Sequence, residues 1–370
     1  MLNSRSNLVS AKSSEKDRIH RKLLAGIYTW VHQRNNGKED TSYEVEEVVE
    51  RAQYGTDMSY KHPWKWSFIM LIILLHIGLV ISIRAAFYAK WQSLLWAFAW
   101  YAVAQVGAGL ASHRYYSHKS FKATLVLRVL LLFSQTLSGQ DSAYRWAVNH
   151  YMHHKYSDTD LDPHNSNRGF FFAHIGWVMK KRHPLLRQKL REVDWSELKK
   201  DKLLMFQYNY YLPLYFLCGV ILPVSVPVYF WNETLLNSYF VTYLLPYGIV
   251  LHSTWSINSF AHTFGVKPYD RRVRATESVV TILATLGDGF HNFHHAFPWD
   301  YRMTNMPWYS MHAKLIDLFA YMGMAYDLKM VTPRVANSHQ KRHGDGTEKW
   351  TFVEAVTPFN RKPMDASRTN

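Results

Sequence analysis

Nine histidines stand in four closely spaced groups along a chain of 370 residues that contains 20 histidines. Two groups repeat the pattern H-x-x-H-H, a third is HRYYSH, and the fourth, NSFAH, adds an asparagine. The candidate ligands are His113, His118, His150, His153, His154, Asn258, His262, His291, His294 and His295. Positions i, i+3 and i+4 share one face of a helix, so each H-x-x-H-H group presents three imidazoles together. Nine imidazoles and one amide are too many for one metal ion and suit two.

Spacing within the first group is less regular. His113 and His118 are five residues apart, and on an ideal α-helix they point about 140° from each other. We therefore expect this pair to straddle a metal or the end of a helix. The alternative for all four groups is a solvated basic surface, which a repeated H-x-x-H-H pattern disfavours. Isolated histidines such as His76, His174 and His252 are expected to be ordinary core residues.

The ligand type leaves the metal open, because imidazole binds iron, zinc and copper alike. Zinc has no redox chemistry and would indicate hydrolysis. The chain has neither the H-E-x-x-H pattern of zinc proteases nor the E-x-x-H pairs of soluble di-iron proteins. A redox metal with dioxygen can instead attack an unactivated C–H bond, which acid–base chemistry alone cannot. A site of this kind beside membrane helices predicts oxidation of a lipid.

Long apolar segments provide those helices, in a chain that is 48% hydrophobic. The predicted spans are 66–87, 93–111, 210–230 and 235–257. Each is long enough to cross a bilayer, and short links join them into two hairpins. The fold class is therefore an all-α integral membrane protein, with four transmembrane helices and a helical cap formed by 112–209 and 258–335. The apolar stretch 125–138 is too short to span, and we expect it at the membrane interface or packed on the cap.

Charge indicates the orientation. The segment 112–209 is rich in lysine and arginine, whereas the hairpin tips carry only Lys90, so the positive-inside rule places the cap and both termini in the cytosol. We divide the chain into a polar tail (1–60), a main domain (61–335) and a disordered tail (336–370). The formal net charge of +15 suits an anionic membrane face or an acidic partner, and no nucleic-acid motif accompanies it. Cys218 is the only cysteine, which excludes an internal disulfide.

With these motifs in place, the chain resembles the membrane acyl-CoA desaturases of the stearoyl-CoA Δ9 type. The resemblance runs from about Trp66 to Gly346. Its carriers are HRYYSH (113–118), HYMHH (150–154), DPHNSNRGFFFAHIGW (162–177), NSFAH (258–262) and GDGFHNFHHAFPWDY (287–301).

That resemblance implies that the nine histidines bind two iron ions, with Asn258 acting through a water. It implies a dioxygen-dependent enzyme of the endoplasmic reticulum membrane that takes electrons from cytochrome b5 and its reductase. The substrate would be a saturated fatty acyl-CoA of the palmitoyl or stearoyl class, and the product would carry a cis double bond at Δ9. The acyl chain would enter a bent tunnel between the spans and the cap.

The resemblance also assigns substrate residues. Gln140, Trp146 and Thr254 match the bend of the tunnel, Tyr101 and Gln105 match its far end, and Asp141, Lys181, Arg182 and Trp255 match the coenzyme A side. Gln105 is expected to shorten the tunnel and favour chains of about 16 carbons or fewer; the alternative is that it points elsewhere. The chain departs from the family at Val148-Asn149, at Tyr151 and at Asp141, so the carrier is coenzyme A bound differently or another acyl carrier.

Two other functions stay open at this stage. The same metal site could hydroxylate or acetylenate the acyl chain, and the chain could be an inactive, lipid-binding membrane scaffold. Four carboxylates near the histidine groups are candidate acceptors for imidazole N–H groups, although the last two could equally cap helices. They are Asp160, Asp162, Asp288 and Asp300.

Overall fold

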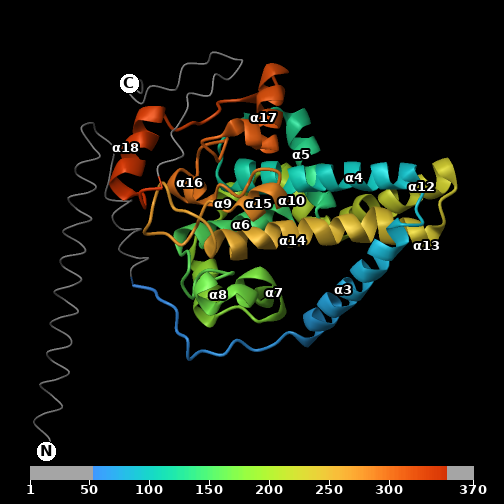
Figure 1. Cartoon of the computed structure of the whole chain (residues 1–370), viewed down its shortest axis with the longest axis horizontal. Coiled ribbons are helices and arrows are strands. Elements are labelled where there is room, and N and C mark those ends of the chain that lie inside the picture. Colours follow the sequence, from blue (N-terminus) through green and yellow to red (C-terminus); the bar gives the residue numbers. More distant parts are fainter. Residues whose placement is uncertain (1–52, 348–370) are drawn as a thin grey trace, which may run out of the picture. The chain divides into compact units, whose positions relative to one another are not determined.

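The computed structural model describes residues 53–347, and residues 56–347 belong to one compact unit. Helices dominate it, and the only sheet among the described residues is the antiparallel pair β1 (Lys122–Ala123) and β2 (Ala325–Tyr326) (Figure 1). The α-helices are α3 (Trp66–Ala86), α4 (Trp91–Val106), α5 (Leu125–Leu137), α6 (Ala143–Lys155), α7 (Trp177–Met179), α8 (Pro184–Glu192), α9 (Ser196–Lys200), α10 (Lys202–Asn209), α11 (Tyr211–Leu214), α12 (Leu222–Trp231), α13 (Leu235–Ser238), α14 (Leu245–Ser259), α15 (Val279–Ala284), α16 (His291–Ala296), α17 (Met311–Tyr321) and α18 (Pro333–His343).

Three helices of the described chain are long and apolar enough to cross a membrane, namely Trp66–Ala86, Trp91–Ser117 and Tyr211–Trp231. They match three of the predicted spans and confirm a helical chain with apolar candidate spans. The fourth predicted span lies in a continuous helical run, 235–259, made of α13, the π-helical segment Tyr239–Leu244 and α14. This run is not among the three, because polar side chains interrupt its apolar sequence. Several of them, including Ser253 and Ser256, are buried against neighbouring helices.

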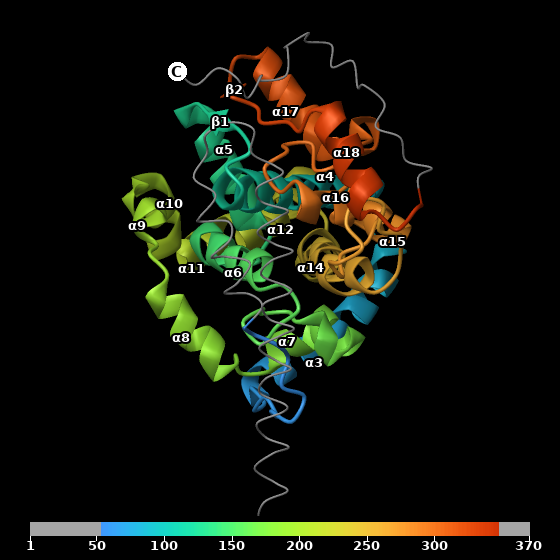
Figure 2. The same ribbon diagram turned by 90° about the vertical axis from the view of Figure 1, so that its left-hand side faces the viewer.

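The tips of the two predicted hairpins meet at one end of the bundle. The Glu233 carboxylate accepts hydrogen bonds from the Ser93 hydroxyl (2.7 Å) and from the Lys90 backbone N–H (3.0 Å). The Lys90 ammonium donates to the Trp231 carbonyl at 2.6 Å. At the other end of the long helices, α6 and α16 lie close to the ends of α4 and α14 in both views (Figure 1 and Figure 2).

The second long helix changes type as it reaches that end. Its last part, Gly107–Ser117, is a π-helix, in which each backbone N–H bonds to the carbonyl five residues earlier. Gly107 allows α5 to pack directly on this segment, because a Cβ atom there would lie 2.1 Å from the Ser134 carbonyl carbon. Helix α5 buries Leu127 and Leu131 against it and leaves the apolar Val129 on its exposed face. The predicted short apolar helix is therefore present and packed on the cap.

The disorder predicted for the C-terminal tail needs correction. Helix α18 occupies Pro333–His343, within the segment 336–370 that was predicted to be disordered. Its sequence is polar, yet Ala336 is fully buried in a cluster with Tyr269 and Phe297, so tertiary contacts rather than composition stabilise it. At the other end, Asp57 falls in the predicted tail 1–60, but its backbone N–H donates to the Asp160 carboxylate at 2.8 Å. The rest of both predicted tails, 1–52 and 348–370, lies outside the described residues.

Candidate metal centre

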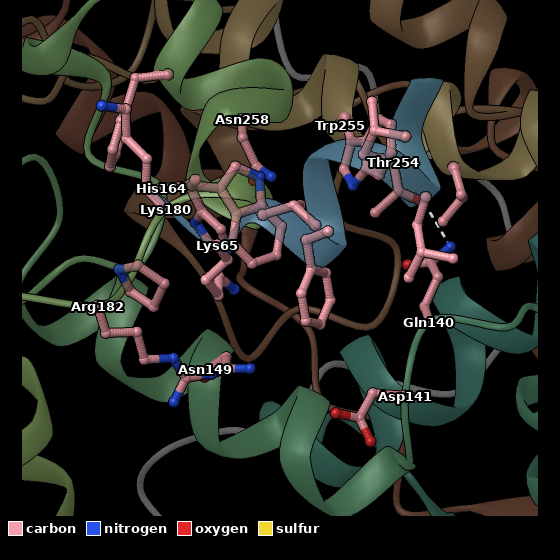
Figure 3. Close-up of a pocket in the computed structure, with 18 of the residues that line it drawn as sticks. Lys65, Gln140, Asp141, Asn149, His164, Lys180, Arg182, Thr254, Trp255 and Asn258 are labelled. Atoms are coloured by element: carbon pink, nitrogen blue, oxygen red, sulfur yellow. Dashed lines mark hydrogen bonds between the residues drawn. The ribbon is translucent and has the colours of Figure 1, made fainter. Parts of the chain in front are cut away.

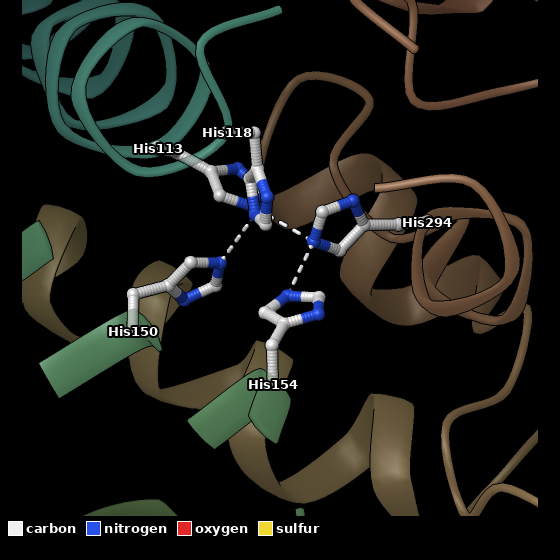
Figure 4. A group of neighbouring side chains, drawn as sticks. All are labelled: His113, His118, His150, His154 and His294. Carbon is white, nitrogen blue, oxygen red and sulfur yellow. Dashed lines mark hydrogen bonds between the residues drawn. The ribbon is translucent and has the colours of Figure 1, made fainter. Parts of the chain in front are cut away.

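The fold gathers all nine predicted histidines into two neighbouring groups. In the first group, each imidazole offers one nitrogen, and these nitrogens all lie within 4.8 Å of one another; the second group meets the same limit. The first group, whose rings face a common centre in Figure 4, consists of His113, His118, His150, His154 and His294. The second consists of His153, His262, His291 and His295. Each H-x-x-H-H helix thus contributes to both groups.

Distances within the groups match those between ligands of one ion. The Nε2 atom of His294 lies 3.0 Å from that of His113 and 2.8 Å from that of His154. In the second group, the Nε2 of His291 lies 3.1 Å from the Nε2 atoms of both His262 and His295. Metal–imidazole bonds are about 2.1 Å long, so two nitrogens at right angles on one ion lie about 3.0 Å apart. A single pair of ring nitrogens at this distance is also consistent with a hydrogen bond. Several nitrogens that converge on one point are instead the arrangement expected around a bound metal ion.

The π-helix explains why both histidines of HRYYSH join one group. The His118 backbone N–H donates to the His113 carbonyl at 3.2 Å, the five-residue closure of a π-turn. This closure brings residues five apart toward the same face, and the two imidazole centroids lie 5.1 Å apart. His113 and His118 thus lie in one group, as expected of a pair that straddles a metal, but the separation of about 140° on an ideal α-helix does not apply here. That angle assumed α-helical geometry where the chain is π-helical.

Burial lowers the pKa of several of these imidazoles and so favours the neutral form, which is the form that binds metal cations. Burial is the main cause that lowers the pKa of His118 to about 3, with the Arg114 charge adding to it. It also holds the pKa values of His150 and His154 well below their usual range, and neighbouring imidazoles reinforce the effect. Burial likewise holds the pKa values of His291, His294 and His295 well below their usual range. Nine buried or half-buried imidazoles that converge in two groups fit a two-metal site.

Carboxylates behind the rings hold several of these histidines in place, as metal-binding histidines usually require. Asp162 lies 3.0 and 3.1 Å from the Nδ1 of His153, and it also accepts from the backbone N–H groups of Asp158 and His164. Burial acts to raise the pKa of Asp162, but the contacts with His153 and His164 keep it well below its usual range. This predicted acceptor is therefore in the expected place.

The other predicted acceptors differ. Asp288 lies 4.0 Å from the Nδ1 of His113 and forms a 2.7 Å ion pair with Arg114. Asp160 pairs with Arg168 at 2.6 Å instead of contacting a histidine of the two groups, so its role is to hold the loop. Asp300 binds Arg302 at 2.6 Å and likewise stabilises the fold.

Sequence reasoning missed two residues next to the histidines. The Asp158 carboxylate lies 3.5 Å from the Nδ1 of His262. His312, on α17, places its Nδ1 3.4 Å from Asp288, and a Cβ atom at Gly109 would lie 2.3 Å from its Nε2. Asp158 was detectable, because it stands four residues before Asp162 in an acidic stretch. His312 has no sequence signal, since it is a lone histidine far from the other motifs.

A cavity of about 720 Å³, part of whose lining is drawn in Figure 3, reaches His150 of the first histidine group. Gln140, Trp146 and Thr254 line it together: the Gln140 amide donates to the Thr254 hydroxyl at 2.8 Å, and the Trp146 indole N–H donates to the Gln140 carbonyl oxygen at 3.4 Å. Trp146 also stacks on His150, with centroids 4.8 Å apart. The residues expected at the tunnel bend therefore form one hydrogen-bonded wall beside the first histidine group. Asn258 lines the cavity as well.

The remaining predicted substrate residues divide into two sets. Asp141, Lys181, Arg182 and Trp255 line the large cavity, where the Arg182 guanidinium donates to the Asn149 amide oxygen at 2.7 Å. Tyr101 and Gln105 do not line it.

Gln105 instead lines a second cavity of about 30 Å³ next to His113, Asn258 and His291. The Tyr101 hydroxyl donates to the Ala284 carbonyl at 3.3 Å. Gln105 was expected at the far end of the tunnel, and the cavity that is open next to it, beside the histidines, is this small one.

The isolated histidines stay outside both metal groups. His174 and His252 lie 3.1 Å apart through their ring nitrogens, and His252 packs edge-on against His76. His76 is exposed on α3 and bonds to the Ile72 carbonyl of its own helix. The expectation of buried core residues is therefore wrong for His76.

Comparisons with known proteins agree with this geometry. The sequence profile of the family Fatty acid desaturase matches residues 91–329. The chain is 42% identical over 290 residues to mouse (Mus musculus) acyl-CoA desaturase 3, which covers 78% of this chain and 81% of the mouse protein. It is 42% identical over 292 residues to human (Homo sapiens) stearoyl-CoA desaturase, covering 79% and 81% of the two chains. It is 41% identical over 275 residues to the acyl-CoA Delta(11) desaturase of Spodoptera littoralis, covering 74% and 81%.

The profile covers most of the chain and includes all ten candidate ligands, and each relative matches more than two thirds of it. The resemblance found in the histidine motifs is confirmed, and this chain belongs to the fatty acid desaturase family.

Proposed function

We propose that this desaturase inserts a cis double bond, at the Δ9 position, into the saturated chain of a fatty acyl-CoA of the palmitoyl or stearoyl class. Two iron ions would be held by the nine histidines, with Asn258 as the tenth group. The observation that carries the proposal is the convergence of nine buried or half-buried imidazoles into two groups beside a cavity of about 720 Å³. The names of the mouse and human relatives support an acyl-CoA substrate.

The family and the redox requirement favour iron over zinc, since desaturation is an oxidation. When bound, two irons would supply, with dioxygen and electrons, the oxidising power to remove two hydrogens from an unactivated chain. The residues of the protein do the rest. The hydrogen-bonded wall of Gln140, Trp146 and Thr254 would hold the chain beside His150. Asp162 orients His153, and burial excludes water from the oxidising site.

For the membrane arrangement, we propose four spans, with the helical run 235–259 as the fourth and the cap and both termini in the cytosol. Support comes from Lys90 and Glu233, which join the two hairpin tips at the end of the bundle opposite α6 and α16 (Figure 1). We further propose that the protein resides in the endoplasmic reticulum membrane and receives electrons from cytochrome b5 and its reductase. The basic cap suits an acidic redox partner.

One prediction concerns the carrier. Changing Lys181 and Arg182 together to glutamate should raise the KM for acyl-CoA by about a hundredfold or more, because each of the two lost charge-assisted contacts with phosphate costs about 1.5–3 kcal/mol. The value of kcat should change little, since both side chains lie at the polar end of the cavity. Steady-state kinetics with acyl-CoA measures both constants. The exposed Lys199→Glu variant, outside the cavity, controls for a general loss of charge, and an unchanged KM in the double variant would exclude this role.

A second prediction concerns chain length. Gln105 is only 2% exposed, and its Oε1 has no hydrogen-bond partner. Gln105→Ala should enlarge the 30 Å³ cavity and shift the ratio of kcat/KM for 18- over 16-carbon substrates upward by about tenfold. Gln105→Met keeps the length of the side chain and should preserve the original preference. Product analysis with acyl chains of different lengths decides, and an unchanged preference in Gln105→Ala would reject the role of Gln105.

The function itself is tested by expressing the chain in a desaturase-deficient cell and profiling its fatty acids. We expect products that are about two mass units lighter than the saturated substrate, which is the loss of two hydrogens. Products about sixteen units heavier would indicate hydroxylation, and a further loss of two hydrogens would indicate acetylenation. Absence of any product from a folded, membrane-inserted chain would favour the inactive lipid-binding scaffold.

A further inference from the structure

We infer that the large cavity has a second, apolar mouth that opens sideways to the bilayer between α3 and the helical run 235–259, and that the acyl chain of the substrate enters and the product leaves through it. This inference rests on the proposed function, because it assumes that the cavity holds an acyl chain. It adds a route of exchange that does not pass through the cap.

The two ends of the cavity differ in chemistry. At the cap, its lining carries Lys65, Lys180, Lys181, Arg182 and His183. A cluster of basic groups of this kind binds the phosphates of a carrier. At the other end the charged groups disappear, and the lining becomes aliphatic and aromatic. An amphiphile with an anionic head and a hydrocarbon tail matches this change in polarity along a single cavity.

The apolar end lies within the membrane-crossing length of α3. Its lining includes Leu71 and Leu74 on α3, and Tyr243 and Tyr247 on the run 235–259, whose rings stack 5.8 Å apart. Leu71 and Leu74 are also 59% and 58% exposed. Side chains that both line a cavity and lie on the surface mark a place where the cavity is open. Because α3 is long and apolar enough to cross the membrane, this opening faces lipid.

Toward the hairpin tips, the gap between α3 and the run 235–259 closes. A Cβ atom on Gly78 would lie 2.5 Å from a methyl group of Leu244, and one on Gly248 would lie 2.3 Å from a methyl group of Leu79. The two helices therefore touch at this level. In Figure 1, α3 slants away from α14 on the other side of this contact. Leu244 also lines the cavity, and the lateral mouth lies on the cap side of this helix contact.

The substrate chain is the occupant that best matches this opening. The same cavity also reaches His150 and Asn258, so a chain lying in the mouth is continuous with the metal centre. The bend wall of Gln140 and Thr254 is closed by a 2.8 Å hydrogen bond. If the acyl chain entered with its end first, every carbon would have to slide past this wall. If the chain entered sideways from the bilayer, it would not have to slide past the wall along its length. The bent cis product would benefit most from leaving sideways through the lateral mouth.

The experiment uses a matched pair of cysteines in the full-length enzyme in lipid nanodiscs. The parent is Cys218→Ala, which removes the only native cysteine. Leu71→Cys lines the mouth, and Met70→Cys lies at the same depth with similar exposure, 55%, but outside the lining. Modifying folded Leu71→Cys with a bulky methanethiosulfonate should lower turnover by about tenfold, and a reductant should restore it. Excess acyl-CoA should slow the modification at position 71 and leave that at position 70 unchanged.

Equal responses at positions 70 and 71, or no response at either, would overturn the lateral mouth. Protection by phosphatidylcholine vesicles without protection by acyl-CoA would assign the opening to a bound lipid and also overturn the proposal. A Cys218→Ala parent that folds but forms no unsaturated product would instead refute the proposed function. Should Leu71→Cys fail to fold, Leu74→Cys with Ile73→Cys as its control (58% and 46% exposed) gives the same comparison.

Discussion

Replacing His294 with alanine should abolish desaturation and release metal from the centre. The Nε2 of this side chain lies within 3.0 Å of the ring nitrogens of both His113 and His154, and it is 1% exposed. Removing it leaves a gap in the ligand set of the first group that no other described side chain fills. Loss of a residue that merely supports a metal ligand commonly costs about 10–100-fold, so loss of a ligand should cost more than about a hundredfold in turnover.

The measurement combines product formation with metal content per purified chain. His76→Ala is the matched control, because His76 is an exposed histidine that bonds only to its own helix and belongs to neither group. It should retain both activity and metal. If His294→Ala kept its full metal content and more than a tenth of its activity, the assignment of the first group as a metal site would be wrong.

The second large effect is expected for Asp162→Asn. The Asp162 carboxylate lies 3.0 Å from the Nδ1 of His153 and also accepts two backbone hydrogen bonds, so it fixes both the tautomer and the direction of the ring. An amide can present its N–H to the imidazole and favour the wrong tautomer. We expect a loss of about 10–100-fold in metal affinity and in turnover, with a smaller change in melting temperature. Metal titration of the purified protein measures the affinity directly.

Asp160→Asn separates this effect from damage to the loop. Asp160 lies two residues away, but it binds Arg168 at 2.6 Å rather than a histidine of the two groups. This variant should lower the melting temperature while the folded fraction keeps its metal affinity. Equal losses of metal affinity in Asp160→Asn and Asp162→Asn would show that the loop as a whole matters and that Asp162 has no specific orienting role.

The sequence predicted the histidines well because their signal is local. The pattern H-x-x-H-H specifies one face of a helix, and α6 and α16 present these faces as expected. The geometry of the first pair could not be predicted, because π-helical closure in Gly107–Ser117 depends on packing, including the close contact between Gly107 and Ser134, and not on composition.

For the carboxylates, too, the sequence indicated which residues lie near the histidine motifs but not which of them contact a histidine. Asp158, Asp160 and Asp162 alternate along one loop, yet only the first and last lie near histidines of the two groups. Which side chains of an irregular loop turn inward depends on its turns, such as the positive φ of 62° at Asp158, and no periodicity reports this. Helix α18 was missed for a related reason, since its stability comes from burial of Ala336 by residues far away in sequence.

Cavities were the hardest feature to predict. Gln140, Trp146 and Thr254 come together as expected, but Gln105 lies in a separate small cavity beside the histidines. Cavity shape depends on how helices cross, and the contacts of Gly78 and Gly248 with neighbouring leucines have no signature in a single sequence.

The most direct test of the account is the metal content of the purified, full-length protein in lipid, measured by elemental analysis with X-ray absorption at the iron edge. Nine histidines in two groups predict two irons per chain, each surrounded by nitrogen or oxygen atoms at about 2.1 Å. Zinc in place of iron, or less than one iron per chain in an active preparation, would contradict it.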